Sequence, residues 1–275
     1  MRIAHEAAQL PLLAPITRPL YRGQFNQLYH EGNRYYGRFD CYQAALAAVP
    51  PQAPSYDTKA AGRMYRGLLD DLRLCDYPAL HWLSKLFSER PVGEKTAVFD
   101  LGGHVGIVYY AFRRYLDYPA QLRWTVHDVS NVIEAGRNWA AEHDAHGQLD
   151  FAAAAGAADG QDVLFTSGAL QYLDYTLPEL LGSLRQPPSH VLVNLLPMHP
   201  TRGYFTLQNM GFAICPYRVM AAQDFIDAMA ELGYSVIDRW DILDRNIHVP
   251  FEPQCTIGRY TGMYLRRTHD AADRS

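Results

Sequence analysis

Apolar residues after position 96 recur in short runs, and the segments between the runs have helical spacing. Five runs are predicted to be strands, namely 97–99, Leu122–His127, a weak one at Leu149–Phe151, Asp162–Thr166 and His190–Leu196. Helices are predicted at Ile107–Tyr115, at Asn131–His143 with Ser130 as its N-cap, and at Pro178–Leu184. Strands that alternate with helices indicate an α/β fold, in which helices wrap a parallel sheet.

The C-terminal part of the pattern differs, because its last two predicted strands have no helix between them. These strands are Tyr234–Trp240 and Gly258–Arg266, and they follow an amphipathic helix at Asp224–Leu232. Strands joined without a helical crossover are expected to pair antiparallel. A second hairpin, inserted at about 203–218, is predicted from two apolar stretches on either side of the turn signal Asn209–Gly211.

The N-terminal third lacks this alternation. Prolines interrupt residues 1–55, where only Tyr42–Val49 is predicted to be helical, and two helices separated by Pro78 are predicted within 58–89. We therefore expect an irregular and helical N-terminal cap at 1–90, a sheet domain at 91–267 and a tail at 268–275.

The first predicted strand of the sheet runs into the glycine-rich turn Gly102-Gly103-His104-Val105-Gly106. Glycines at such a turn let the backbone approach a ligand closely. A dinucleotide fingerprint would need a further glycine at position 101, which is Leu101. Asp100 ends the strand instead. Asp128 ends the second strand 22 residues beyond Gly106, the separation at which an acid meets a ribose in nucleotide-binding folds.

Asp100, Gly102, His104 and Gly106 resemble motif I of class I S-adenosylmethionine-dependent methyltransferases, with His104 in place of the middle glycine. The segment Ser167–Leu173 is similar to the family's segment after the fourth strand. Taken in order, the segments 98–106, 124–137, 162–173 and 215–220 resemble a methyltransferase family often associated with cell-surface polysaccharide genes. The resemblance covers most of the chain. It implies a Rossmann-like class I fold, whose seven-stranded, mostly parallel sheet has an antiparallel last strand.

The resemblance also implies that S-adenosyl-L-methionine is the cofactor, with S-adenosyl-L-homocysteine as the product. The cofactor-binding residues would be Asp100, Gly102, Gly103, His104, Gly106, Asp128, Val129, Ser167, Gly168 and Ala169. The acceptor would be a small molecule or saccharide methylated at oxygen. His199, after the fifth strand, is the candidate general base, because a hydroxyl acceptor must lose its proton. Candidate substrate-binding residues are Gln171, Tyr172, Gln208, Tyr217 and Arg218.

The composition of the chain argues against several other classes of protein. A net charge of −4 argues against a nucleic-acid-binding protein. The four cysteines form no C-x-x-C pair, and the cluster Glu142, His143, Asp144 and His146 closes a helix and is predicted to be solvated, so no metal is expected. We expect a cytoplasmic protein without a membrane span and allow for a homodimer. Two alternatives stay open, a nicotinamide-dependent oxidoreductase and a non-catalytic binding or assembly subunit with the same fold.

Overall fold

The computed structural model describes residues 13–59, 61–63 and 66–268, and its contacts divide the chain into two compact units. The first, here called the four-stranded unit, comprises Met1–Tyr56, Pro197–Gln223 and Leu243–Tyr260. The second, the seven-stranded unit, comprises Asp57–Leu196, Asp224–Ile242 and Thr261–Ser275. The predicted cap at 1–90 is therefore shared between the two units. The predicted tail at 268–275 lies outside the described residues apart from Thr268.

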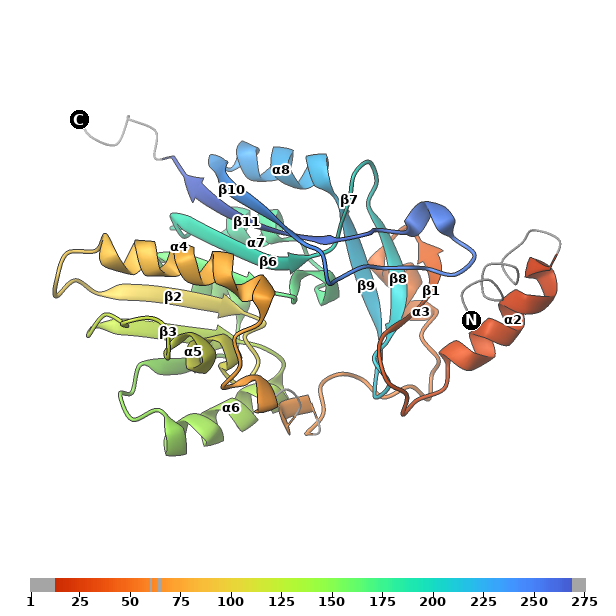
Figure 1. The fold of residues 1–275 in the computed structure, drawn as a ribbon, viewed down its shortest axis with the longest axis horizontal. Helices are drawn as coiled ribbons and strands as arrows, with labels where there is room; N and C mark the ends of the chain where they lie inside the picture. The colour runs from red at the N-terminus through yellow and green to blue at the C-terminus, as the bar shows by residue number, and fades with distance from the viewer. Residues whose placement is uncertain (1–12, 60, 64–65, 269–275) are drawn as a thin grey trace. The chain divides into compact units, whose positions relative to one another are not determined.

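The seven-stranded unit contains one sheet with the strand order β10-β11-β6-β5-β2-β3-β4 (Figure 1). Its strands are β2 (Thr96–Leu101), β3 (Leu122–His127), β4 (Leu149–Ala152), β5 (Val163–Ser167), β6 (His190–Leu196), β10 (Tyr234–Ile242) and β11 (Tyr260–Arg267). The neighbouring strands β4, β3, β2, β5 and β6 pair in parallel, and β11 pairs antiparallel with β6. The predicted fold, a mostly parallel sheet with an antiparallel last strand, is confirmed.

In the described part of the chain, this sheet is accompanied by the helices α4 (Tyr77–Ser88), α5 (Ile107–Phe112), α6 (Ser130–His143), α7 (Leu177–Ser183) and α8 (Ala222–Glu231). Helix α7 begins at a capping box, in which Thr176 and Glu179 satisfy each other's backbone N–H groups. The sequence predicted Ser130 as the N-cap of α6, but Ser130 is the first residue of the helix and Val129 occupies the N-cap position. Instead, the Asp57 carboxylate accepts the Asn131 N–H at 2.9 Å, so a residue distant in sequence caps this helix.

The core of the seven-stranded unit lies along the central strands. Trp124, Phe165, Val98 and Phe112 are fully buried in one cluster. Central strands of a parallel sheet are buried on both faces, so they appear in the sequence as continuous apolar runs. No helix in the described part of the chain is long and apolar enough to cross a membrane.

The four-stranded unit has the strand order β1-β8-β9-β7. These strands are β1 (Arg34–Phe39), β7 (Met198–His199), β8 (Tyr204–Asn209) and β9 (Ile214–Ala221), accompanied by α2 (Ala14–Phe25) and α3 (Tyr42–Ala47). The predicted hairpin is confirmed, because β8 pairs antiparallel with β9 around a turn in which Gly211 has a φ of 86°. The tight approach of Gly211 to the His30 backbone leaves no space for a side chain there.

The N-terminal part of the chain differs from the prediction in three places. Residues 34–39, expected to be irregular, form β1, which pairs with β8 across a long sequence separation. Helix α2 contains two prolines. Pro15 occupies its first turn, where the missing N–H has no helical partner to lose, and Pro19 lies inside the helix. The first of the two helices expected within 58–89 is replaced by the short 3-10 turns η1 (Ala61–Arg63), η2 (Arg66–Leu68) and η3 (Leu74–Asp76).

Candidate functional site

The glycine turn after β2 repeatedly adopts the left-handed backbone conformation. Gly102 and Gly106 have φ values of 75° and 90°, and His104, between them, has a φ of 57°. Histidine is among the few residues other than glycine that are enriched in this region. The replacement of the motif's middle glycine by His104 therefore leaves that residue in the left-handed conformation that a glycine readily adopts.

The His104 side chain is buried and is directed toward η1. Its ring Nε2 lies 2.9 Å from the carbonyl oxygen of Ala61, which is fully buried. The backbone N–H of His104 donates a hydrogen bond to Asp128 Oδ2 at 3.0 Å. Residue 104 thus connects the turn to η1 through its ring and to the end of β3 through its backbone.

Asp128 connects the ends of two neighbouring strands. Its Oδ2 accepts the N–H of His104, and its Oδ1 accepts the N–H of Val129 at 2.8 Å. Burial raises the pKa of the Asp128 carboxyl, whereas the hydrogen bond from the Val129 N–H and the nearby His104 oppose that rise. A carboxylate oxygen has capacity for more than one hydrogen bond, so Asp128 retains acceptor capacity for a ligand hydroxyl.

Asp100 supports the turn from the strand side. It is only 1 % exposed, and its Oδ2 accepts the indole N–H of Trp124 at 3.1 Å. Its Oδ1 has no hydrogen-bond partner among the described residues. Burial raises the pKa of Asp100 to about 7. A Cβ at position 103 would overlap the Asp100 carboxylate, so Gly103 is required by this close approach.

The segment after β5 packs directly against the glycine turn. A Cβ on Gly102 would overlap the Cβ of Ala169, so the two loops are in close contact. Gln171 is buried beside them and donates its Nε2–H to Gly168 O at 2.8 Å, while its Oε1 has no partner among the described residues. The turn after β2, the end of β3 and the segment after β5 therefore meet at the carboxyl edge of the sheet.

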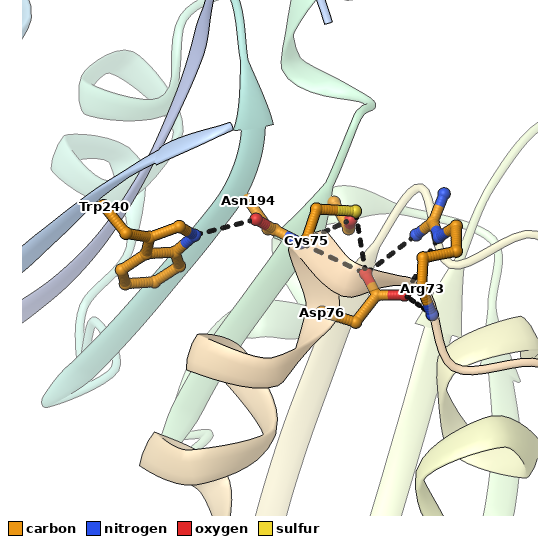
Figure 2. A network of polar contacts seen from close by, with 6 residues as sticks. Arg73, Cys75, Asp76, Asn194 and Trp240 are labelled. Atoms are coloured by element: carbon orange, nitrogen blue, oxygen red, sulfur yellow. Dashed lines mark hydrogen bonds and ion pairs between the residues drawn. The ribbon is translucent and has the colours of Figure 1, made fainter. Parts of the chain in front are cut away.

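Sequence reasoning did not identify a buried polar network at the same edge, which Figure 2 shows. Asp76 is 3 % exposed and accepts hydrogen bonds from Arg73 Nε and Nη2, each at 2.9 Å, and from Asn194 Nδ2 at 3.2 Å. Asn194 Oδ1 in turn accepts the indole N–H of Trp240. Asn194 pairs with Ser167 across β5 and β6. A single polar residue within the apolar run of β6 was the signal in the sequence.

The predicted residue Tyr172 ends the short 3-10 turn Leu170–Tyr172 of the seven-stranded unit. The remaining predicted residues, His199, Gln208, Tyr217 and Arg218, belong to the four-stranded unit. The Nδ1 atom of His199 accepts the N–H groups of Thr201 and Arg202, each at 3.2 Å, so Nδ1 carries no proton in this arrangement. Partial burial, together with the charge on Arg202, lowers the pKa of His199. Its imidazole is therefore neutral at pH 7, and it stabilises the turn that follows β7.

Gln208 and Tyr217 are part of a buried hydrogen-bond network in that unit. Tyr217 is 1 % exposed, and its hydroxyl lies 2.7 Å from that of Tyr260. Gln208 Nε2 donates to the hydroxyl of Tyr35 at 3.3 Å. The guanidinium of Arg218 lies 4.9 Å from the centre of the Phe205 ring. These contacts join residues of β1, β8 and β9 with Tyr260, all within the four-stranded unit.

The sequence predicted that the cluster at the end of α6 is solvated, and Glu142, His143 and His146 are exposed, whereas the side chain of Asp144 is not. The Asp144 side chain is buried and accepts hydrogen bonds from the Tyr109 hydroxyl at 2.7 Å and the Leu149 N–H at 2.9 Å. The ring of His143 stacks on Trp139. Among the described residues, no group of three His, Cys, Asp or Glu side chains is arranged to hold a metal ion.

The strand order and the antiparallel β11 define a Rossmann-like class I methyltransferase fold. No protein-family model and no curated protein sequence matches the chain. Its fold is similar to 1,6-didemethyltoxoflavin-N1-methyltransferase of Burkholderia thailandensis, solved with S-adenosylhomocysteine, at 17 % identity and a TM-score of 0.44 over 71 % of this chain and 79 % of that one.

The chain is also similar to two other methyltransferases. Magnesium protoporphyrin IX methyltransferase of Synechocystis is 13 % identical, with a TM-score of 0.49 over 78 % of this chain and 96 % of that one. The CcbJ methyltransferase of Streptomyces caelestis is 13 % identical, with a TM-score of 0.40 over 68 % of this chain and 96 % of that one. The fold assignment rests on the strand order and not on these likenesses.

Proposed function

We propose that this chain is an S-adenosylmethionine-dependent methyltransferase that acts on a small molecule or a saccharide, at oxygen. The observation that carries this proposal is the contact between Asp128 and the glycine turn. It places an acid at the end of β3 beside the left-handed turn after β2, on a sheet of the class I order. An acid in that position is suited to accept the two hydroxyls of a ribose.

Three groups of residues would hold the cofactor. The backbone of Gly102, Gly103, His104 and Gly106 would face its amino-acid end, and Asp128 would accept its ribose hydroxyls. Val129 would pack on the adenine, and the segment from Ser167 to Ala169 would close the other side. When bound, the cofactor supplies an electrophilic methyl group for in-line displacement. The protein's main contribution is then to align the acceptor and exclude water.

Two features of the residues present fit such a ligand. The glycines at 102 and 103 let two loops and the Asp100 carboxylate come together without a side chain between them. The Gln171 Oε1 is a buried acceptor without a partner among the described residues, and such an atom is unfavourable unless a ligand or water satisfies it. Gln171 is therefore a candidate for contact with a ligand N–H or O–H group.

The two alternative functions are less well supported. The case for a non-catalytic subunit depended on His104, and the left-handed φ of that residue supports a turn with its usual path. The case for a nicotinamide-dependent oxidoreductase requires a glycine where the chain has Leu101, whose side chain is buried.

His199 remains the proposed base for an oxygen acceptor. Its neutral imidazole is in the required charge state, but Nδ1 accepts two backbone N–H groups, so the single ring proton lies on Nε2. His199 could therefore accept a proton only at Nδ1, after the hydrogen bonds from Thr201 and Arg202 are released. Replacing His199 with glutamine is expected to lower kcat while leaving the affinity for S-adenosylhomocysteine unchanged. Turnover can be measured with labelled S-adenosylmethionine and a low-molecular-weight metabolite extract. Equal kcat values for variant and wild type would remove His199 as the base.

Calorimetric titration with S-adenosylhomocysteine tests the cofactor assignment directly. Asp128→Asn removes a charged acceptor from the ribose site, and we expect its Kd to rise about 10- to 100-fold, because a hydrogen bond to a charged group contributes roughly 1.5–3 kcal/mol. Glu134→Gln is the control, since Glu134 is exposed on the following helix. Asp144 is unsuitable as a control because its buried carboxylate holds Tyr109 and Leu149. Tighter binding of NAD than of S-adenosylhomocysteine by the wild type would contradict the proposal.

A further inference from the structure

The four-stranded unit contains a groove that the proposed methyl transfer does not use. It has a volume of about 310 Å³ and lies between α2, β1, the end of α3 and β8. Its floor is apolar, since Phe25 is fully buried and Leu207 almost so. The rim carries the guanidinium groups of Arg18, Arg22 and Arg38.

Positive charge is concentrated in the segment that forms this groove. Residues 13–39 contain four arginines and a single acid, Glu31, in a chain whose net charge is −4. Arg18 and Arg22 are four residues apart on α2, so they share one face of that helix. Arg38 reaches the same groove from β1. Arg22 lies in the last turn of α2, where the helix dipole favours a cation, but that argument explains neither Arg18 nor Arg38.

Nearby acids offset only part of this charge. Arg18 pairs with Glu252, and Arg38 pairs with Asp40, whose side chain is 87 % exposed and hence well solvated. No acidic side chain among the described residues pairs with Arg22. Its guanidinium lies 5.8 Å from the centre of the Tyr36 ring, which also lines the groove. The groove therefore keeps a net positive rim above an aromatic and apolar floor.

We propose that this groove binds a small organic phosphate. Guanidinium groups match phosphate oxygens with paired N–H donors, and arginine is the residue most often used where such recognition is needed. The phosphate would lie between Arg22 and Arg38, and an apolar or aromatic body would pack on Tyr36 and Leu207. This site is independent of the cofactor assignment, and it would stand if the chain bound no S-adenosylmethionine.

Titration of the full chain followed by 31P NMR tests the proposal with phenyl phosphate and inorganic phosphate as probes, and ligand-observed proton NMR does so with phenol. We expect saturable binding of phenyl phosphate, weaker binding of inorganic phosphate and none of phenol. Arg22→Gln and Arg38→Gln are each expected to weaken phenyl phosphate binding about tenfold or more, because each removes a charged pair of donors. Arg22→Lys should fall between Arg22→Gln and the wild type, since it keeps the charge and loses the planar fork.

The control is Arg185→Gln, because the Arg185 side chain is 93 % exposed and lies in the other unit. It should bind phenyl phosphate as the wild type does. Equal affinities in all variants, or binding that does not saturate, would show that phosphate associates only with general surface charge, and this would overturn the proposal. Far-UV circular dichroism of each variant checks that α2 and β1 remain folded, and Arg38→Gln provides a second test if Arg22→Gln unfolds.

Discussion

The buried carboxyl of Asp100 predicts an unusual dependence of stability on pH. Its folded-state pKa is about 7, whereas the unperturbed value is 3.8, and the main cause is burial beneath the glycine turn. Because the pKa is raised, the folded state holds a proton between pH 4 and 7 that the unfolded state has released. Asp100 thus contributes stability that is fully present below pH 4 and is lost as the pH rises through 7.

The size of the effect follows from the shift of about 3 pKa units. At 1.36 kcal/mol per unit, the contribution of Asp100 to the free energy of unfolding changes by up to about 4 kcal/mol between pH 4 and pH 8. Asp100→Asn resembles the protonated acid and does not titrate. Its amide oxygen can still accept the indole N–H of Trp124, while its buried NH₂ group adds a penalty that is the same at every pH.

Urea unfolding of wild type and Asp100→Asn, followed by tryptophan fluorescence from pH 4 to pH 8, measures this difference. The stability of the variant relative to wild type should rise by about 4 kcal/mol across that range. Other titrating groups act similarly on both proteins and cancel in the difference. Asp150→Asn is the control, because the hydrogen bond from Arg123 lowers the pKa of Asp150 from 3.8. Its titration therefore lies below this range, and its stability relative to wild type should stay nearly constant from pH 5 to pH 8. A relative stability of Asp100→Asn that stays constant with pH would refute the reasoning.

Three further substitutions test buried contacts seen in the structure. Asp76→Ala should lower the free energy of unfolding by about 3–5 kcal/mol, because it leaves buried donors and a partly buried guanidinium without their acceptor, and urea titration measures it. Gly136→Ala in α6 should destabilise the protein, since its Cβ would overlap the ring of Phe151. In Gly23→Ala, in α2, the added Cβ has no atom within 4 Å. This substitution should leave the free energy of unfolding unchanged or raise it by about 1 kcal/mol, because alanine has the higher helix propensity. Thermal unfolding that gave both glycine variants the same sign would contradict the packing argument.

Two strands of the parallel sheet could be predicted from the sequence because burial keeps them mostly apolar. β6 is apolar from Val191 to Leu196 except for Asn194, and β3 buries Leu122, Trp124 and Val126. Leu122–His127 and His190–Leu196 were predicted with the bounds that β3 and β6 have. The edge strand β1 was not predicted, because its sequence RYYGRF contains two arginines and a glycine. Its stability comes from pairing with β8, about 170 residues away, and that pairing leaves no local signal.

The polar residues of the site were only partly predictable for a related reason. The positions of Asp100 and Asp128 follow from where their strands end, so both could be placed at the sheet edge from the sequence. The partner of each carboxylate could not, because Trp124 and the His104 amide reach them only after the strands align in register. Asp144 was misjudged because its acceptor role depends on Tyr109 and Leu149, which come from other elements.

His104 illustrates how a departure from a family pattern can be accommodated by contacts elsewhere in the chain. A left-handed backbone conformation costs a non-glycine residue about 1 kcal/mol or more, which by itself favours glycine at position 104. The ring of His104 reaches the buried Ala61 carbonyl, and its N–H reaches Asp128; each such hydrogen bond contributes on the order of 1 kcal/mol. A glycine would keep the bond to Asp128 and lose the one to Ala61, leaving a buried carbonyl without that donor. The side chain at this position therefore attaches η1 to the turn, while the backbone alone maintains the geometry on which the proposed cofactor binding depends.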